Sequence, residues 1–362
     1  MDFIGRDVHT GPIKHTFQVG MDFRRNEVSS MSYNSVVIDT IDVLKEIVNR
    51  LPQDVSLTEG STTTTYSNSY GMMAQEVMTL SKWAKAILAL RYSFGDSYDN
   101  SSSGATRGDA LNPMAGVIIT PYKGIHLFGS FTTTTDLRSA GNLMEDGSSV
   151  GASTVRQFET GVKAEFFKSR LRLNVTLFDV LNSNLAYQIY DDAMQATGRY
   201  GKAGDLSRRG VEVEVTGRLH RSLQVVAGYA FLDAKYKNSL AFMDGSAPSN
   251  APRHTANGWL YYRPEFAKGL SIGVGAYYVG ERPVNDFSMK ASHANTTPGV
   301  KPFDMKAHTT LNATVGYQYK RASINLIFNN ITNAEGYSSY YRGGFINPID
   351  PFNFSTALSY NF

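Results

Sequence analysis

The chain lacks cysteine altogether, and this absence removes three kinds of chemistry. Without thiols it can form no disulfide, no zinc–thiolate centre and no cysteine nucleophile. It also lacks a strong excess of one charge, because 35 Lys and Arg residues stand against 32 Asp and Glu residues over 362 positions. The basic residues are scattered, not clustered, so nucleic acid is not an expected partner.

Long apolar runs are missing as well. Hydrophobic residues make up 42% of the chain, yet no stretch of about 18 apolar residues occurs, which excludes an ordinary transmembrane helix. Residues 1–15 contain no basic segment followed by an apolar one, the pattern of a secretory signal. The seven histidines show no metal-ligand spacing. We therefore expect no metal site and no cofactor.

What the chain does contain is strict alternation of apolar and polar residues. From Phe352 to Phe362, a face of aromatic residues with Thr356 and Leu358 alternates with a face of Asn, Ser and Ala. A period of two places the two sets on opposite faces of a β-strand. The same pattern recurs within residues 17–23, 171–177, 223–231 and 311–319. Such strands are typical of a transmembrane β-barrel, which meets lipid on one face and its lumen on the other.

Short and long connectors follow one another along the chain. Short ones lie near residues 81, 121–124, 168–170, 219–222, 264–268 and 320–321, and long ones near 26–65, 96–111, 135–153, 182–203, 237–250, 282–305 and 335–350. Outer-membrane barrels have short periplasmic turns and longer extracellular loops. We therefore predict an all-β fold, a transmembrane antiparallel barrel of about fourteen strands that uses residues 1–362 as one domain.

Two local patterns add detail. Aromatic residues gather near predicted strand ends, among them Trp259, Tyr261 and Tyr262, which suits the aromatic girdle at a membrane interface. The alternative is that these rings belong to the core of a β-sandwich. Within residues 41–51, apolar side chains recur at helical spacing, and this predicts a short helix inside the first long loop.

Six phrases occur in a characteristic order: QFETGVKAEFF (157–167), RRGVEVEVTG (208–217), LQVVAGYAFLDA (223–234), APRHTANGWLYY (251–262), GLSIGVGAYYVGE (269–281) and LIFNNITNAEGY (326–337). Together they resemble the C-terminal part of the barrel of TonB-dependent outer-membrane receptors, especially the siderophore-receptor branch. The terminal Phe362 matches the aromatic end that the barrel-assembly machinery reads in this class.

The resemblance implies a Gram-negative outer-membrane receptor and transporter for an iron chelate, a ferric siderophore, and no enzyme activity. It matches about two thirds of a barrel of about 22 strands. The family's signal peptide, TonB box and plug domain are not seen, so we expect a truncated form. The expected partners are the chelate, outer-membrane lipid and, through Phe362, the barrel-assembly machinery. A plug domain and TonB–ExbB–ExbD are expected only for the intact receptor.

A charged set is expected on the lumen face, facing the plug: Arg91, Lys163, Glu165, Arg172, Glu212 and Glu214. The resemblance implies that the last two glutamates dock against plug arginines. Ordinary solvated charge on a lumen wall would explain all six equally well. No histidine or nucleophile is tied to these carboxylates, so an acid–base role does not follow.

Ligand contacts are expected on the extracellular loops, since binding residues concentrate on connections held by a rigid scaffold. Aromatic stacking and arginine charge pairing would suit an anionic or aromatic chelate. The candidates are Tyr337, Tyr340, Tyr341, Arg342 and Phe345, followed by the weaker Arg199, Tyr200, Arg282 and Phe287. Alternatively, Tyr340 and Tyr341 cap the aromatic girdle.

Two other functions compete with the receptor hypothesis. One is a passive porin or autotransporter-type barrel, which needs no plug. The other is an outer-membrane protease or lipase, but no Ser/His/Asp arrangement can be placed on one rim of the barrel. Within the receptor hypothesis, the substrate remains open among a siderophore, haem, cobalamin and a glycan.

Overall fold

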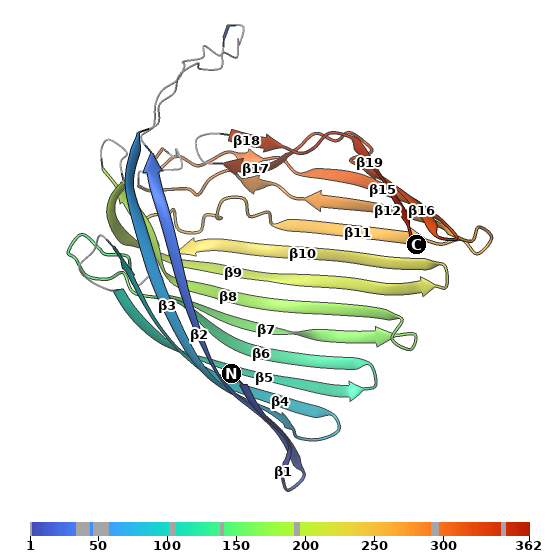
Figure 1. Ribbon diagram of the computed structural model, residues 1–362, viewed down its shortest axis with the longest axis horizontal. Coiled ribbons are helices and arrows are strands. Elements are labelled where there is room, and N and C mark those ends of the chain that lie inside the picture. The colour runs from blue at the N-terminus through green and yellow to red at the C-terminus, as the bar shows by residue number, and fades with distance from the viewer. Residues whose placement is uncertain are drawn as a thin grey trace.

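The computed structural model describes residues 2–33, 44–45, 58–100, 106–137, 141–191, 196–290, 297–341 and 345–362. Strands and their connections account for these residues (Figure 1). Within the described ranges, no helix has the length and apolar content needed to cross a membrane. The short helix predicted for residues 41–51 falls, apart from Leu44 and Lys45, outside the described residues.

Fifteen strands form one antiparallel sheet, and β1 and β19 are its two edges. In sheet order the strands are β1 (Asp2–Thr10), β2 (Ile13–Tyr33), β3 (Glu59–Thr79), β4 (Ala84–Asp99), β5 (Thr106–Tyr122), β6 (Ile125–Asp136), β7 (Ser153–Phe166), β8 (Leu171–Tyr190), β9 (Ala196–His220), β10 (Leu223–Lys237), β11 (His254–Tyr262), β12 (Leu270–Val279), β15 (His308–Tyr319), β16 (Ala322–Asn329) and β19 (Asn353–Tyr360). Two small separate ladders pair β13 (Arg282–Pro283) with β14 (Asp304–Met305), and β17 (Tyr337–Tyr341) with β18 (Phe345–Pro348).

The sheet has fifteen strands, one more than the sequence predicted. The additional strand is β1, which forms a hairpin with β2 around Gly11 (φ 59°). Residues 2–10 read DFIGRDVHT, in which charged and apolar residues do not alternate strictly. Period-two alternation therefore does not reveal this strand.

Tight turns and long connections lie at opposite ends of the strands (Figure 1). We call these ends the turn edge and the loop edge. Several strands run further into the predicted loops than expected: β2 reaches Tyr33, β3 starts at Glu59, β8 reaches Tyr190 and β9 starts at Ala196. A hairpin ladder can continue beyond the apolar part of its strands, because each added residue pair satisfies its own backbone groups.

The register of the sheet separates an apolar face from a polar face. One row of paired residues crosses six strands and contains only apolar side chains: Val225, Leu260, Val274, Ala313, Phe328 and Phe354. Of these, Leu260 is 49% exposed, Val274 54% and Phe354 67%. A continuous apolar surface of this kind is what the lipid-facing side of a barrel requires.

A packed interior occurs at the loop edge. Buried apolar side chains there come from the loop-edge ends of β9 and β10 and from the later connections: Ala203, Leu206, Ala234, Tyr236, Ala241, Val284 and Met305. Backbone hydrogen bonds join these connections, for example from Met243 N to Phe287 O (2.8 Å) and from Val284 N to Phe303 O (3.1 Å). The long connections of this region therefore form one packed unit that can present side chains in fixed positions.

Candidate functional site

All six charged residues predicted for the lumen lie on the polar face. Arg91 lies on β4, Lys163 and Glu165 on β7, Arg172 on β8, and Glu212 and Glu214 on β9. The register pairs Glu165 with Arg172 across β7 and β8, and Glu214 with Asn174 across β8 and β9. The six charges are therefore spread over four strands and do not form a single cluster.

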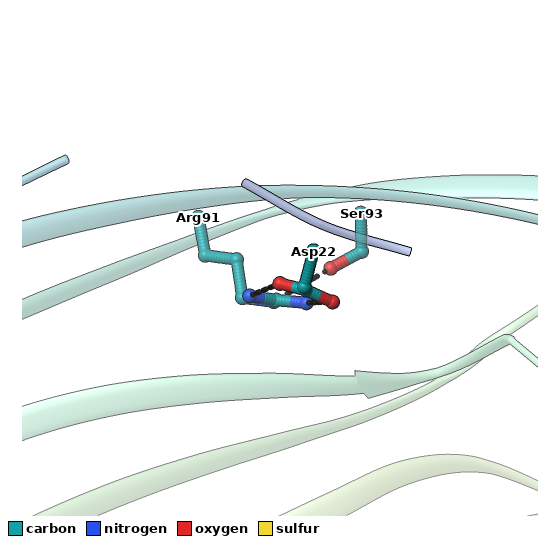
Figure 2. A network of polar contacts seen from close by, with 3 residues as sticks. All are labelled: Asp22, Arg91 and Ser93. Atoms are coloured by element: carbon teal, nitrogen blue, oxygen red, sulfur yellow. Dashed lines mark hydrogen bonds and ion pairs between the residues drawn. The ribbon is translucent and has the colours of Figure 1, made fainter. Parts of the chain in front are cut away.

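An ion pair not foreseen from the sequence spans three neighbouring strands. Arg91 donates from Nη1 to Asp22 Oδ2 (2.8 Å), from Nη2 to Asp22 Oδ1 (3.0 Å) and from Nε to Ser93 Oγ (3.1 Å). Figure 2 shows the guanidinium and the carboxylate lying side by side in this two-bonded arrangement. The pair passes over Gly71 of β3, where a Cβ would lie 2.1 Å from Arg91 Nη2. Glycine at this position leaves the space that lets Asp22 of β2 reach Arg91 of β4.

The other polar-face charges have weaker or longer contacts. Glu165 lies 3.7 Å from Arg172 Nε and also accepts a hydrogen bond from the Ser169 hydroxyl. The Lys163 ammonium lies 5.2 Å from the centre of the Phe128 ring, within cation–π range. These contacts are on exposed or half-buried groups, where each contributes little to stability.

Glu212 and Glu214 line a cavity of ≈ 360 Å³ on the polar face, together with Asn257 and Tyr277. Glu214 accepts a 3.3 Å hydrogen bond from Asn174 Nδ2. The two carboxylates face one open space that is otherwise lined by neutral groups. The chemistry of this cavity suits a cation.

Aromatic rings lie flat over glycines of the next strand on the polar face. The Trp259 ring covers Gly275 and the Tyr261 ring covers Gly273; a Cβ at these glycines would lie 2.3 Å and 3.0 Å from the rings. Trp259 also donates from Nε1 to the Tyr277 hydroxyl (2.7 Å). Trp259 and Tyr261 therefore lie on the polar face, opposite Leu260, whereas the predicted aromatic girdle requires the apolar face. The prediction used only their closeness to a strand end. It did not consider that both residues are adjacent to Leu260 in the strand and therefore lie on the opposite face.

At the loop edge, the predicted ligand-binding residues are divided among three connections. Tyr337 begins β17 and is 46% exposed. It borders a cavity of ≈ 700 Å³ whose other walls include Lys306 and Pro348. Tyr340 and Tyr341 belong to β17 and Phe345 to β18, whereas Arg342 lies outside the described residues.

The weaker candidates lie on other elements of the loop edge. Arg199 and Tyr200 are on β9; Arg199 is exposed and its Nη1 lies 3.5 Å from Met144 O. Phe287 is half-buried, and its carbonyl accepts from Met243 N. The structure thus brings Tyr337, Tyr340, Tyr341 and Phe345 into one hairpin, but Arg199 and Tyr200 belong to a strand in another part of the sheet.

Arg282 differs from the other candidates because it is only 4% exposed. Its Nη2 donates to the carbonyl oxygens of Tyr337 (2.5 Å) and Ser338 (2.9 Å), and its Nη1 lies 3.4 Å from Gly280 O. Burial lowers the pKa of this guanidinium below its usual value. The donors of Arg282 are thus directed to the protein backbone.

Asparagine and aspartate residues that the sequence did not single out organise the loop edge. Asn330 is 4% exposed; its Nδ2 donates to Ala334 O and to Asp350 O (both 2.9 Å). Asp286 accepts from the Tyr236 hydroxyl (2.8 Å) and from Ser249 N (2.9 Å). Asn330 has a positive φ (47°), which Asn tolerates better than most residues, and the one sequence signal for it was its place in the asparagine-rich phrase 326–337.

The described residues contain no group of three or more His, Asp or Glu side chains that could hold a metal ion. The features present are a cavity at the loop edge, an acidic cavity on the polar face and a rigid sheet between them. This arrangement is suited to binding and passage of a ligand at a membrane.

Comparison with known proteins identifies the family. The family model described as TonB dependent receptor-like, beta-barrel, matches residues 2–333. Among curated proteins, the metal-pseudopaline receptor CntO of Pseudomonas aeruginosa is 22% identical over 381 residues, which cover 100% of this chain and 50% of that receptor. The ferrioxamine B receptor of Salmonella typhimurium is 24% identical over 337 residues, covering 90% of this chain and 44% of that protein.

Solved structures agree on the fold. The ferric-catecholate import receptor Fiu of E. coli K12, in its closed form, superposes with a TM-score of 0.81 at 20% identity and covers 99% of this chain. The match takes up 54% of the Fiu chain. The siderophore receptor PiuA of Acinetobacter baumannii gives a TM-score of 0.78 at 16% identity. The chain thus spans about half the length of the relatives it matches.

Proposed function

Because the chain belongs to the family of TonB-dependent receptor β-barrels, we propose that it forms part of an outer-membrane receptor that imports an iron chelate, a ferric siderophore. The observation that carries this proposal is the family match over residues 2–333, combined with relatives that are named as receptors for metal chelates. The same match favours a receptor over a passive porin.

The two faces of the sheet support a location in the outer membrane. The exposed apolar row from Val225 to Phe354 would face lipid, and the charged polar face would line the lumen. The loop edge would then lie at the cell surface, and the turn edge with the C-terminal Phe362 would face the periplasm, where the barrel-assembly machinery acts.

We assign chelate binding to the loop edge, around the cavity next to Tyr337. The β17–β18 hairpin carries Tyr337, Tyr340, Tyr341 and Phe345 in a short stretch, and aromatic rings can stack on an aromatic chelate. Arg342 belongs to the same segment of sequence and would add positive charge. Arg199, Tyr200 and Phe287 are further candidate contacts on other connections.

Energised uptake is proposed for the whole receptor, since this chain spans only about half the length of the relatives it matches. As the resemblance implies, a plug domain would occupy the lumen and TonB–ExbB–ExbD would supply energy. The cavity lined by Glu212 and Glu214 is the place on the polar face best suited to plug arginines.

Growth on ferric siderophores tests the proposal. Residues 1–362 are expressed behind a supplied signal peptide in a strain that lacks its own siderophore receptors, and in parallel joined to the plug and first strands of a relative. We expect growth only for the joined form, and loss of that growth when TonB is deleted. TonB-dependent growth with residues 1–362 alone would contradict the need for a plug, and growth that persists without TonB would indicate a passive channel.

A further inference from the structure

Arg282 is a buried cation at the loop edge that carries three polar contacts, all to backbone carbonyls. The acceptors are Gly280 O, two residues earlier, and Tyr337 O and Ser338 O, which come 55 and 56 residues later in the chain. Taking a guanidinium out of water is costly unless its donors are satisfied. A residue kept at 4% exposure with its donors on the backbone is therefore performing a structural task.

The two distant acceptors coincide with an irregularity in the β17–β18 hairpin. Tyr337 pairs with Pro348 and Ser339 with Asn347, so Ser338 is an extra residue, a β-bulge. A bulge interrupts the ladder and leaves backbone groups without their regular partners. Nη2 of Arg282 donates to both carbonyl oxygens at the bulge, Tyr337 O at 2.5 Å and Ser338 O at 2.9 Å.

The hairpin has a second attachment at its base. Ile349 N donates to Gly336 O (3.0 Å), and the buried Asn330 holds Ala334 O and Asp350 O. Asn330 joins the hairpin to the end of β16, whereas Arg282 joins it to the segment that follows β12. Two attachments from different strands fix the direction of the hairpin as well as its position.

We propose that Arg282 is a positioning residue that holds the β17–β18 hairpin over the loop edge through the bulge at Ser338. For the part that concerns ligand affinity, the inference rests on the proposed function. The hairpin side chains contact the chelate, and Arg282 sets where they stand without touching it. This role also explains why arginine is present at a buried site: its planar guanidinium bonds Gly280 O through Nη1 while Nη2 bonds the two hairpin carbonyls, which the single nitrogen of lysine cannot do in the same way.

Hydrogen exchange measured on the full chain in lipid vesicles tests the anchoring directly. Arg282→Lys keeps the charge and removes the fork, and we expect amides of residues 337–341 and 345–347 to exchange about tenfold faster or more, while those of β8 and β9 are unchanged. Arg221→Lys is the matched control, because Arg221 is exposed in a tight turn at the turn edge. Unchanged exchange in the hairpin of the Arg282→Lys protein would overturn the proposal.

Deletion of Ser338 gives an independent variant in case the arginine substitution prevents folding. It removes the bulge and one of the two acceptors from the hairpin side, so exchange should rise to a similar extent. Adding Arg282→Lys to the deletion should then change exchange by less than the sum of the two single effects. Fully additive effects would show that Arg282 and the bulge act independently, which contradicts the proposal.

Chelate titration separates this inference from the proposed function. With ferrioxamine B as the probe, weaker binding of Arg282→Lys that accompanies faster hairpin exchange supports positioning. Weaker binding with unchanged exchange would identify Arg282 as a direct ligand contact and overturn the inference. If the unmodified chain joined to a relative's plug binds no ferric chelate, the proposed function fails, and exchange still decides the anchoring.

Discussion

Replacing Gly210 by alanine probes how closely the strands approach on the polar face. A Cβ at Gly210 would lie 2.1 Å from the Phe231 carbonyl oxygen and 2.5 Å from Phe178 Cζ. The ring can move, but the carbonyl belongs to the paired strand β10, so the added methyl must push β9 and β10 apart. Overpacking of this kind costs about 1–3 kcal/mol, and one distorted ladder bond adds about 1 kcal/mol.

The unfolded state offsets part of that cost, because alanine has less backbone freedom to lose than glycine, by about 0.4–1 kcal/mol. We therefore expect Gly210→Ala to lower the free energy of unfolding by roughly 1–3 kcal/mol. Urea unfolding in lipid vesicles, followed by the fluorescence of the two tryptophans, measures the change.

Two other glycines serve as graded controls. At Gly129 the nearest atom to an added Cβ is 3.9 Å away, so alanine should be neutral or slightly stabilising. At Gly71 the added Cβ meets only the ends of the Arg91 and Asp22 side chains, and losing that exposed ion pair costs at most about 1 kcal/mol. If Gly210→Ala unfolds at the same urea concentration as Gly129→Ala, the reasoning about strand contact is refuted.

Three further outcomes are expected. Val315→Arg should oppose insertion into lipid vesicles by roughly 2–4 kcal/mol, and Gly316→Arg by much less, because Val315 pairs with apolar-face residues; equal folding yields would contradict the assigned faces. Asn330→Ala should destabilise the chain by about 1–3 kcal/mol in urea unfolding, because it leaves buried backbone groups unpaired; an unchanged midpoint would speak against this. Hydrogen bonds from the side chain and backbone of Ser148 hold the pKa of Asp146 below its usual 3.8. The turn at this loop should therefore be fully formed above pH 3.8 and loosen only as the pH falls below that value. Carbon NMR titration of the Asp146 carboxyl checks this, and Ser148→Ala should raise its pKa.

The sequence was sufficient to predict the faces of most strands. Alternation within residues 223–231 and 311–319 placed Val225 and Val315 on the apolar face, and their registers agree. Alternation is a local property, and each strand of an antiparallel sheet inherits the face of its paired neighbour. The long and short connectors likewise predicted which edge carries the loops, because their lengths can be read directly.

Properties that depend on distant partners could not be predicted. Arg282 and Arg199 look alike in the sequence as loop cations, yet one is buried against Tyr337 O and the other is exposed. Gly71 carries no local signal either, since its purpose depends on Asp22 and Arg91 of the flanking strands. The positions of the ligand-binding candidates remain predictions for the same reason, because they depend on how separate loops meet.

The pairing order of the large sheet limits how it can close. Each neighbouring pair is antiparallel, so the strand direction reverses at every step from β1 to β19. Since the sheet has fifteen strands, its two edge strands run in the same direction. Direct contact between β1 and β19 would therefore be parallel, and so would both junctions between two copies of the sheet that run in the same orientation. Any polypeptide that completes this sheet with antiparallel ladders throughout must contribute an odd number of strands.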